Sequence, residues 1–484
     1  MFMFAALALV VGCSQQPAKA ANDNLLLRVQ FAGTAALTAN TNAAYLTNFA
    51  TLPETAALGT QIVARVASLP GRLIAAGSTN GSTELLPPVF AEMLRTGFTL
   101  ELRGDNHGIT DFALAAKAKE PLAARWDEAW RTAGKGSFSV QRAGDWLFVA
   151  GGKTTAPTLA AIQKTVAGPG LETGSVLQAE LASSLIPGPV QRSVYGGFER
   201  LKLSVTPANQ SLKIRGSATY SYDLPKLGTP PVVPVDLVTE TAVSFTLVRE
   251  PGAWLEPNSV LRSFLPNPIP NATFFWGGQS SPYQFFMALP FTGRDEFNTH
   301  FGPVLQAQLL PISKAIDFSS IVLDTNRAAI QMKTVPFVLP QVQVRQCGTN
   351  DYLVAEVFPS TDSQPGLTPA LIERVSGRTN LVLYDWEYTQ LRFDTWFRIG
   401  QLALLCSGHQ QHINGTPSLR WIQKVQLNTP SAINTSTEIT QTGPRELTLK
   451  RSAPLAFTST ELYWLANWLE SANFPAANFL MPIP

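Results

Sequence analysis

Residues 97–131 set out the structural unit that most constrains how this chain can fold. Phe98, Leu100 and Leu102 alternate with polar residues, which is the period of a half-buried strand. A run of turn-forming residues at 104–108 then separates this strand from a second strand-like run. The pattern predicts a β-hairpin.

A helix is expected directly after this hairpin. Pro121 stands where a helix would begin. One helical face then carries the apolar residues Leu122, Trp126, Ala129 and Trp130. The unit is therefore a hairpin followed by an amphipathic helix, with both tryptophans directed at the sheet.

The same order of elements recurs in the second half of the sequence. Strand and helix patterns follow one another at 243–248, 258–265, 273–276, 284–289, 294–310 and 318–323. The helix after the second hairpin again carries aromatic residues, Phe297 and Phe301, four positions apart. A third and weaker repeat of the pattern lies at 371–405, and its predicted helix contains Trp396 and Phe397. We therefore predict an α+β fold of two repeated units, each an antiparallel sheet with helices on one face, in the split β-α-β-like order β-α-β-β-α-β.

A proline-rich segment at 224–236 predicts the boundary between these units, because it reads as an extended linker. We expect residues 24–223 to form the first α+β repeat domain. Residues 237–484 would form the second, with a C-terminal extension. A short polar tether at 14–23 precedes both.

The N-terminal residues 1–13 are expected to be a signal peptide, not part of the fold. They are apolar up to Val10-Val11-Gly12-Cys13, which resembles the lipobox of bacterial lipoproteins, although no Lys or Arg precedes the apolar run. The resemblance implies that Cys13 is lipidated, and Ser14 after it resembles lipoproteins sent to the outer membrane. Ordinary signal cleavage after Ala20, at Ala18-Lys19-Ala20, is the alternative.

Composition agrees with a compartment outside the cytoplasm. Charged residues make up 14% of the chain, against about 25% in a typical domain. Lys plus Arg number 36 against 34 for Asp plus Glu, without a basic block, so we expect no binding to nucleic acid. Such a compartment permits disulfides, and a Cys347–Cys406 bridge could add about 4 kcal/mol of stability through its loop of about sixty residues. Two unpaired buried thiols are the alternative.

Candidate metal ligands cluster at Cys406, His409 and His412, because thiolate and imidazole bind zinc or copper. A structural zinc site needs four ligands, and a fourth would come from Cys347 or from the distant His107 or His300. A polar loop that ends a helix explains the cluster as well, so we expect no metal.

Catalytic patterns are few. Asp127-Glu128 and Asp295-Glu296 are adjacent on predicted helices, where side chains diverge by about 100° and do not share a site. Asp385 and Glu387 form the third carboxylate pair. Residues 151–154 resemble the tail of a phosphate-binding loop but lack its first glycine, and 277–281 read as a hairpin turn instead of a nucleophile elbow.

Aromatic hairpin–helix units are abundant and catalytic polar residues are scarce. We therefore expect a non-catalytic bacterial cell-envelope lipoprotein that binds or scaffolds, without a cofactor. It would be lipid-anchored in the outer membrane and would face the periplasm. Its partners would be the membrane and an envelope protein or ligand. The alternatives are a periplasmic hydrolase whose site is assembled from distant residues and a metal-binding envelope protein.

Overall fold

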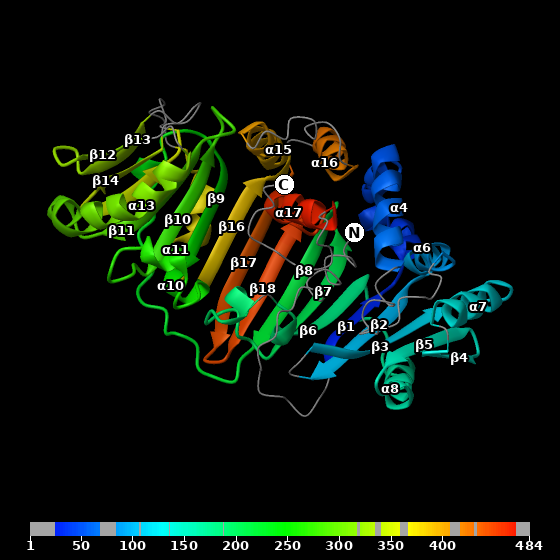
Figure 1. The fold of residues 1–484 in the computed structure, drawn as a ribbon. Helices are drawn as coiled ribbons and strands as arrows, with labels where there is room; N and C mark the ends of the chain where they lie inside the picture. Colours follow the sequence, from blue (N-terminus) through cyan, green and yellow to red (C-terminus); the bar gives the residue numbers. More distant parts are fainter. Residues whose placement is uncertain are drawn as a thin grey trace.

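The computed structural model describes residues 25–67, 84–105, 108–134, 136–186, 188–316, 320–333, 340–358, 366–406, 417–429 and 433–470 (Figure 1). Within these ranges, eighteen strands form one antiparallel sheet. From one edge to the other their order is β4-β5-β3-β2-β1-β6-β7-β8-β18-β17-β16-β9-β10-β11-β15-β14-β13-β12. The protein is thus a mixed α/β structure built on a large antiparallel sheet.

The strands are, in chain order, β1 (Leu25–Phe31), β2 (Phe98–Asp105), β3 (Gly108–Lys117), β4 (Phe138–Ala143), β5 (Trp146–Gly152), β6 (Leu177–Ala182), β7 (Arg200–Ala208), β8 (Ser211–Thr219), β9 (Ala242–Arg249), β10 (Ala272–Gly278), β11 (Phe285–Phe291), β12 (Ser320–Asp324), β13 (Ala329–Lys333), β14 (Gln341–Cys347), β15 (Asn350–Glu356), β16 (Leu381–Tyr388), β17 (Asn434–Gly443) and β18 (Glu446–Ala453). The α-helices are α2 (Thr34–Ala39), α3 (Leu46–Ala50), α4 (Pro53–Ala67), α6 (Leu86–Thr96), α7 (Leu122–Gly134), α8 (Thr155–Ala167), α9 (Gly188–Gln191), α10 (Pro251–Trp254), α11 (Val260–Ser263), α12 (Arg294–Glu296), α13 (Gly302–Ile316), α14 (Pro369–Val375), α15 (Thr389–Cys406), α16 (Pro417–Asn428) and α17 (Ser459–Glu470). Short η turns lie at Thr41–Ala43, Ser183–Leu185, Val235–Leu237 and Phe297–Phe301.

The hairpin–helix unit predicted from residues 97–131 is present. It consists of β2, β3 and α7, and both of its tryptophans, Trp126 and Trp130, are 1% exposed. The Trp130 ring packs edge-on against Phe90 and Phe138, at centroid distances of 5.6 and 5.8 Å. The i, i+4 spacing that identified this helix face therefore also identified the residues that fix it to the sheet.

One face of the sheet, which we call the inner face, carries most of the helices. Strand residues such as Leu27 and Leu114 share a core there with Leu58 of α4 and Trp130 of α7. Leu462 of α17, near the C-terminus, belongs to the same core. Figure 1 accordingly shows α17, α4 and α6 on one side of the strands.

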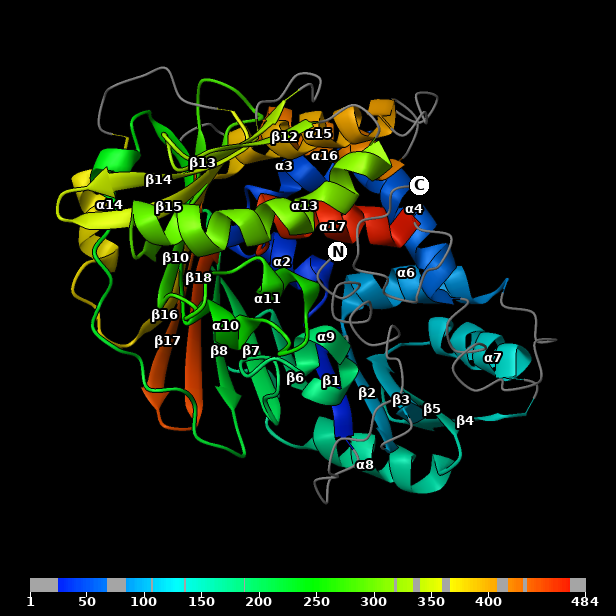
Figure 2. The ribbon, with the colours of Figure 1, turned by 60° about the vertical axis from the view of Figure 1, so that its left-hand side comes forward.

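The prediction that the helices lie on one face is wrong, because the outer face is covered at both ends. There α8 packs on Ala113, Ala115 and Phe148, and α14 packs on a separate core that includes Phe245. Figure 2 shows α14 at the left, on the side of the strands away from α17. Since apolar residues alternate to both sides of β3, this strand is buried on two faces.

The segment 224–236 separates the two halves of the sequence but not two sheets. β8, before the segment, pairs with β18 near the C-terminus. The inner-face core also mixes residues from both halves, such as Leu58 with Trp421. The sheet therefore runs continuously across the domain boundary that the sequence predicts.

Candidate functional site

An apolar pocket of about 550 Å³ lies on the inner face, between α13 and strands of the second half. One row of residues, directly opposite one another on four strands, lines it: Thr246, Phe275, Met287 and Ala355. The volume is within the range of about 300–1,000 Å³ that is typical of small-molecule sites. The pocket is therefore our candidate site.

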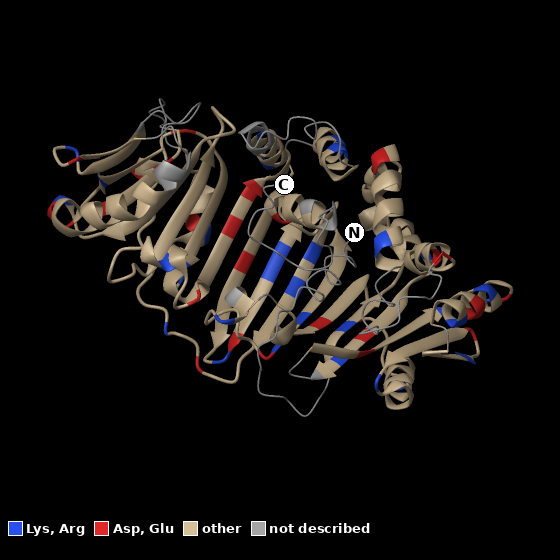
Figure 3. Cartoon of the chain, viewed as in Figure 1, with Lys and Arg blue, Asp and Glu red and all other residues tan. Residues whose placement is uncertain are grey.

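The helical wall of the pocket follows from the spacing of its apolar residues. Phe301, Leu305 and Leu309 line the pocket at intervals of four residues, so one stripe of the helix faces the sheet. Val304, next to Leu305, is 55% exposed and lies off this stripe. β10 and β11 carry no charged residues, whereas β16, β18 and β8 each carry two or three. Figure 3 shows this difference between the two parts of the sheet.

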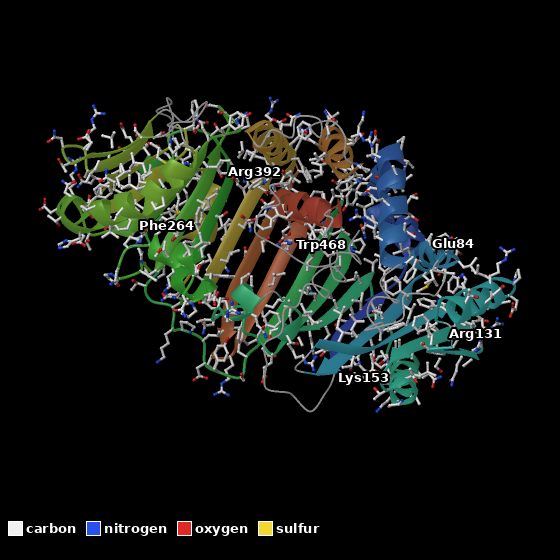
Figure 4. The ribbon with its side chains drawn as sticks, in the orientation of Figure 1. Glu84, Arg131, Lys153, Phe264, Arg392 and Trp468 are labelled. Carbon is white, nitrogen blue, oxygen red and sulfur yellow. The ribbon has the colours of Figure 1, made fainter. Side chains whose placement is uncertain are left out.

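Arg392 of α15 lines the same pocket and is 7% exposed. Its guanidinium carbon lies 4.9 Å from the ring centroid of Phe285 and 5.4 Å from that of Trp396. The Nε and Nη1 atoms are buried and have no hydrogen-bond partner among the described residues. Burial lowers the pKa of this guanidinium. Figure 4 labels Arg392 together with Phe264, which also lines the pocket.

Gly277 of β10 allows the guanidinium to approach the sheet. A Cβ atom at this position would lie 3.1 Å from Nη1 of Arg392 and 3.0 Å from Oγ of Ser244. Any larger side chain would force one of these groups to move. The residue that sequence reasoning assigned to a hairpin turn thus has a packing role beside the pocket.

The carboxylate pair noted in the sequence, Asp385 and Glu387, lies next to Arg392, on the inner face of β16. Asp385 accepts a hydrogen bond of 2.6 Å from Oγ1 of Thr246. Glu387 accepts hydrogen bonds of 2.7 and 2.8 Å from the backbone nitrogen and Oγ of Ser459. Burial raises the pKa of Asp385. Burial and the charge of Asp385 raise the pKa of Glu387 to about 7.

These contacts give Glu387 a clear structural role. Ser459 is the first residue of α17, so the carboxylate accepts from a backbone N–H that the helix cannot satisfy itself. Arg451 of β18 adds two hydrogen bonds, of 2.6 and 2.8 Å, to Glu461 in the first turn of α17. Thr458 and Glu461 also form reciprocal side-chain to backbone hydrogen bonds of 3.1 and 2.9 Å, a capping box. The cluster fixes α17 to the sheet.

Of the histidine and cysteine side chains that sequence reasoning singled out, those of His300 and Cys347 lie in the described part of the chain. His300 is an exposed residue of the turn before α13 and lies 3.1 Å from Glu296. Cys13, His107, His409, His412 and the Cys406 side chain lie outside the described residues. Across the described part of the chain, no group of three or more His, Cys, Asp or Glu residues could hold a metal.

The Cys347 side chain is buried, and its Sγ donates to Oδ2 of Asp236 at 3.7 Å. Burial raises the pKa of this thiol. Because the Cys406 side chain is not described, the pairing of the two cysteines stays a prediction.

The remaining acidic pairs lie on helix surfaces, as expected. Asp127 forms an ion pair of 2.9 Å with Arg131, one turn further along α7. Asp295 is exposed. Neither pair meets the pocket.

Sequence reasoning missed Arg392 and the pocket itself. The available signal was a basic residue in an otherwise aromatic and aliphatic segment, Leu391-Arg392-Phe393. A buried cation cannot be distinguished from an exposed one by that pattern alone, because burial depends on how α15 packs on β9, β16 and β17.

Comparisons with known proteins identify no family for this chain. No protein-family model matches the chain, and no curated protein matches it. Among solved structures, one described as "Structure of crystal form I of TP0453" aligns with a TM-score of 0.23 and 11% identity, covering 50% of this chain and 100% of that chain. A score this low carries no argument. Among the described helices, none is long and apolar enough to cross a membrane.

Proposed function

We propose that this protein is a non-catalytic binding protein that holds a long apolar chain in the pocket between α13 and the sheet. The observation that supports this most is the lining itself. On one side it consists of Phe301, Leu305 and Leu309, and on the other of Phe275 and Met287. An apolar concavity of this size binds ligands mainly by excluding water from apolar surface.

The arrangement of strands supports an internal duplication as part of this proposal. β1 lies between β2 and β6, and β9 lies between β10 and β16. β3 pairs with β5, and β11 pairs with β15. The hairpin β7–β8 then matches β17–β18, and these two hairpins meet at the centre of the sheet. Residues 25–219 and 242–453 would thus be two copies of one unit, with α7 corresponding to α13.

The two copies differ where the pocket lies. In the first, Trp126 and Trp130 of α7 fill the space above the sheet and are 1% exposed. In the second, the corresponding helix presents Leu305 and Leu309, and the space above the sheet is the pocket. Loss of two large side chains at this interface would convert a packed core into a binding site.

A lipid anchor at Cys13 would place this pocket at the cell envelope, as the lipobox resemblance implies. The tether of residues 14–23 could span at most about 35 Å. We expect Cys13→Ala to release the protein from membranes. Continued membrane attachment of this variant would rule out lipidation.

The binding proposal is tested by filling the pocket. Replacing Leu305 and Leu309 with Trp on α13 would reproduce the i, i+4 tryptophan pair of α7. The control, Val304→Trp with Ala307→Trp, adds the same two indoles at exposed positions. We expect the neutral dye N-phenylnaphthylamine to bind the wild type and the control equally.

The pocket variant should bind this dye at least about tenfold more weakly, which corresponds to about 1.4 kcal/mol. Far-ultraviolet circular dichroism would establish that both variants are folded. Equal binding by the folded pocket variant and the wild type, or no binding by the wild type, would refute the proposed function.

A further inference from the structure

We propose that Arg392 binds an anionic head group, a carboxylate or a phosphate, so that the ligand is an amphiphile with its chain in the pocket and its head at α15. This inference rests on the proposed function, because it concerns the ligand of the same pocket. Arg392 is the one cation among the residues that line the pocket, all of them described. The other charged lining residue, Glu356, already pairs with Arg345.

The guanidinium of Arg392 is incompletely satisfied within the described protein. A buried N–H group without an acceptor costs about 1–3 kcal/mol, and more when it is charged. Here both Nε and Nη1 are buried and have no partner among the described residues, and the guanidinium lies over the rings of Phe285 and Trp396. A carboxylate or phosphate would supply paired oxygen acceptors in the fork geometry that guanidinium matches.

Two other arginines of this sheet, Arg249 and Arg451, show how arginines with a structural role are satisfied here. Arg249 is 0% exposed and donates to four backbone carbonyls, at distances of 2.6–3.5 Å. Arg451 binds both carboxylate oxygens of Glu461. For Nε and Nη1 of Arg392 the described residues provide neither a backbone carbonyl nor a carboxylate, although this side chain is nearly as buried as that of Arg249. The contrast points to an acceptor that comes from outside the chain.

The acidic groups near Arg392 are compatible with an incoming anion. Glu461 is paired with Arg451, and Glu387 caps α17 with a pKa raised by burial to about 7. Asp385 accepts from Thr246, and burial raises its pKa too. With a pKa of about 7, Glu387 is partly protonated at neutral pH, which lowers the negative charge that an anionic head would meet.

The lining beside Arg392 suits a head-and-tail ligand. Ser244 is 8% exposed and lines the pocket next to Gly277, against which Nη1 of Arg392 packs. Beyond these two residues the lining is mainly aromatic and aliphatic, with Phe275, Leu305 and Leu309. Its other polar side chains, Thr246, Gln341 and Glu356, already form hydrogen bonds within the protein. A hydroxyl and a guanidinium thus lie beside one another, next to Gly277, in a lining that is mainly apolar.

The test compares three ligands that share a chain and differ in the head: dodecanoate, methyl dodecanoate and dodecyl phosphate. Affinities would be measured by displacement of N-phenylnaphthylamine from the full chain. The variant is Arg392→Met, which keeps the length of the side chain and its packing on Phe285. The control is Arg398→Met, which removes an exposed arginine of the same helix that pairs with Asp394.

We expect the wild type and the control to bind an anionic ligand at least tenfold more tightly than the methyl ester. The Arg392→Met protein should lose this preference while it binds the methyl ester as the wild type does. Tighter binding of dodecanoate than of dodecyl phosphate would support a carboxylate head, and the reverse order a phosphate head.

Two outcomes would overturn the assignment of Arg392 while leaving the pocket as a binding site. One is equal binding of the acid and the ester by the wild type. The other is an Arg392→Met protein that keeps the preference, or that loses all three ligands to the same degree. If the wild type bound none of the three, the proposed function itself would fail.

Discussion

Glu387 illustrates how burial changes what a carboxyl group contributes to the fold. Its folded-state pKa is raised from the ordinary value of 4.5 to about 7, first by burial and then by the charge of Asp385. The folded state therefore binds this proton more tightly than the unfolded state does. The stabilising contribution is fully present below about pH 4.5 and is lost as the pH rises through about 7.

Glu387→Gln should flatten this dependence, because a neutral amide can still accept from Ser459 without a charge to bury. Between pH 4.5 and 7 the wild type should lose on the order of 1–3 kcal/mol more than the variant. Urea unfolding at several pH values measures the difference, with Glu128→Gln on the exposed surface of α7 as the control. Parallel profiles for all three proteins would show that Glu387 does not titrate in this range.

Glu101 of β2 shows the opposite case. Burial alone would raise its pKa, but hydrogen bonds from Thr165, Arg103 and Arg28 outweigh burial and lower it. This carboxylate stabilises the fold at neutral pH, and the contribution is lost as the pH falls through its folded pKa.

Glu101→Ala should destabilise the protein at pH 7 by about 3–5 kcal/mol, because two arginines would lose their shared partner. Asp127→Ala, which removes an exposed partner of Arg131, should cost less than about 1 kcal/mol. Chemical denaturation measures both. Similar losses in the two variants would contradict a structural role for the Glu101 cluster.

At the level of single elements, the sequence predicted most of what local patterns control. The hairpin β2–β3 and the amphipathic helix α7 were both predicted, because each depends on residues within a few positions of one another. That helices cover both faces of the sheet could not be predicted, because Ala113 and Ala115 on the outer face give no strong signal of burial.

The candidate site was readable only in part, for the same reason. Asp385 and Glu387 share a strand face because they are two residues apart, and the sequence showed them as a pair. The pocket is instead a volume left open between α13 and four strands whose residues lie far apart in the chain. No local pattern encodes such a volume.

The role of α7 can be tested directly by truncating one of its tryptophans. Trp130→Ala should lower the free energy of unfolding by about 3–5 kcal/mol, because it removes a fully buried indole from an aromatic cluster. Trp464→Ala, at a partly exposed position of α17, should cost less. Thermal and urea unfolding compare the two. Equal losses would mean that α7 is not fixed to the sheet through Trp130.

At the scale of the whole molecule, the two sequence halves share a sheet and a core. β8 and β18 pair along their lengths, and α4 of the first half packs with α16 of the second, where Trp421 Nε1 donates to Thr55 Oγ1 at 2.9 Å. We therefore expect the full chain to unfold in a single cooperative transition when unfolding is monitored by circular dichroism. An isolated fragment 24–223 should not fold stably, because part of its core comes from α16 and α17.

Two separate transitions, or a cooperatively folded fragment, would show instead that 224–236 joins independent domains. That result would leave the pocket intact, since all its lining residues belong to the second half.

The central claim is that the space between α13 and the sheet holds the chain of an amphiphile whose head lies at Arg392. Crystals of the protein grown with a fatty acid brominated near its methyl end would locate the chain by the anomalous signal of bromine. We expect that signal inside the pocket, among Phe275, Met287 and Leu305, with the carboxylate at the guanidinium. A bromine site elsewhere on the protein, or an empty pocket at saturating ligand, would contradict the account.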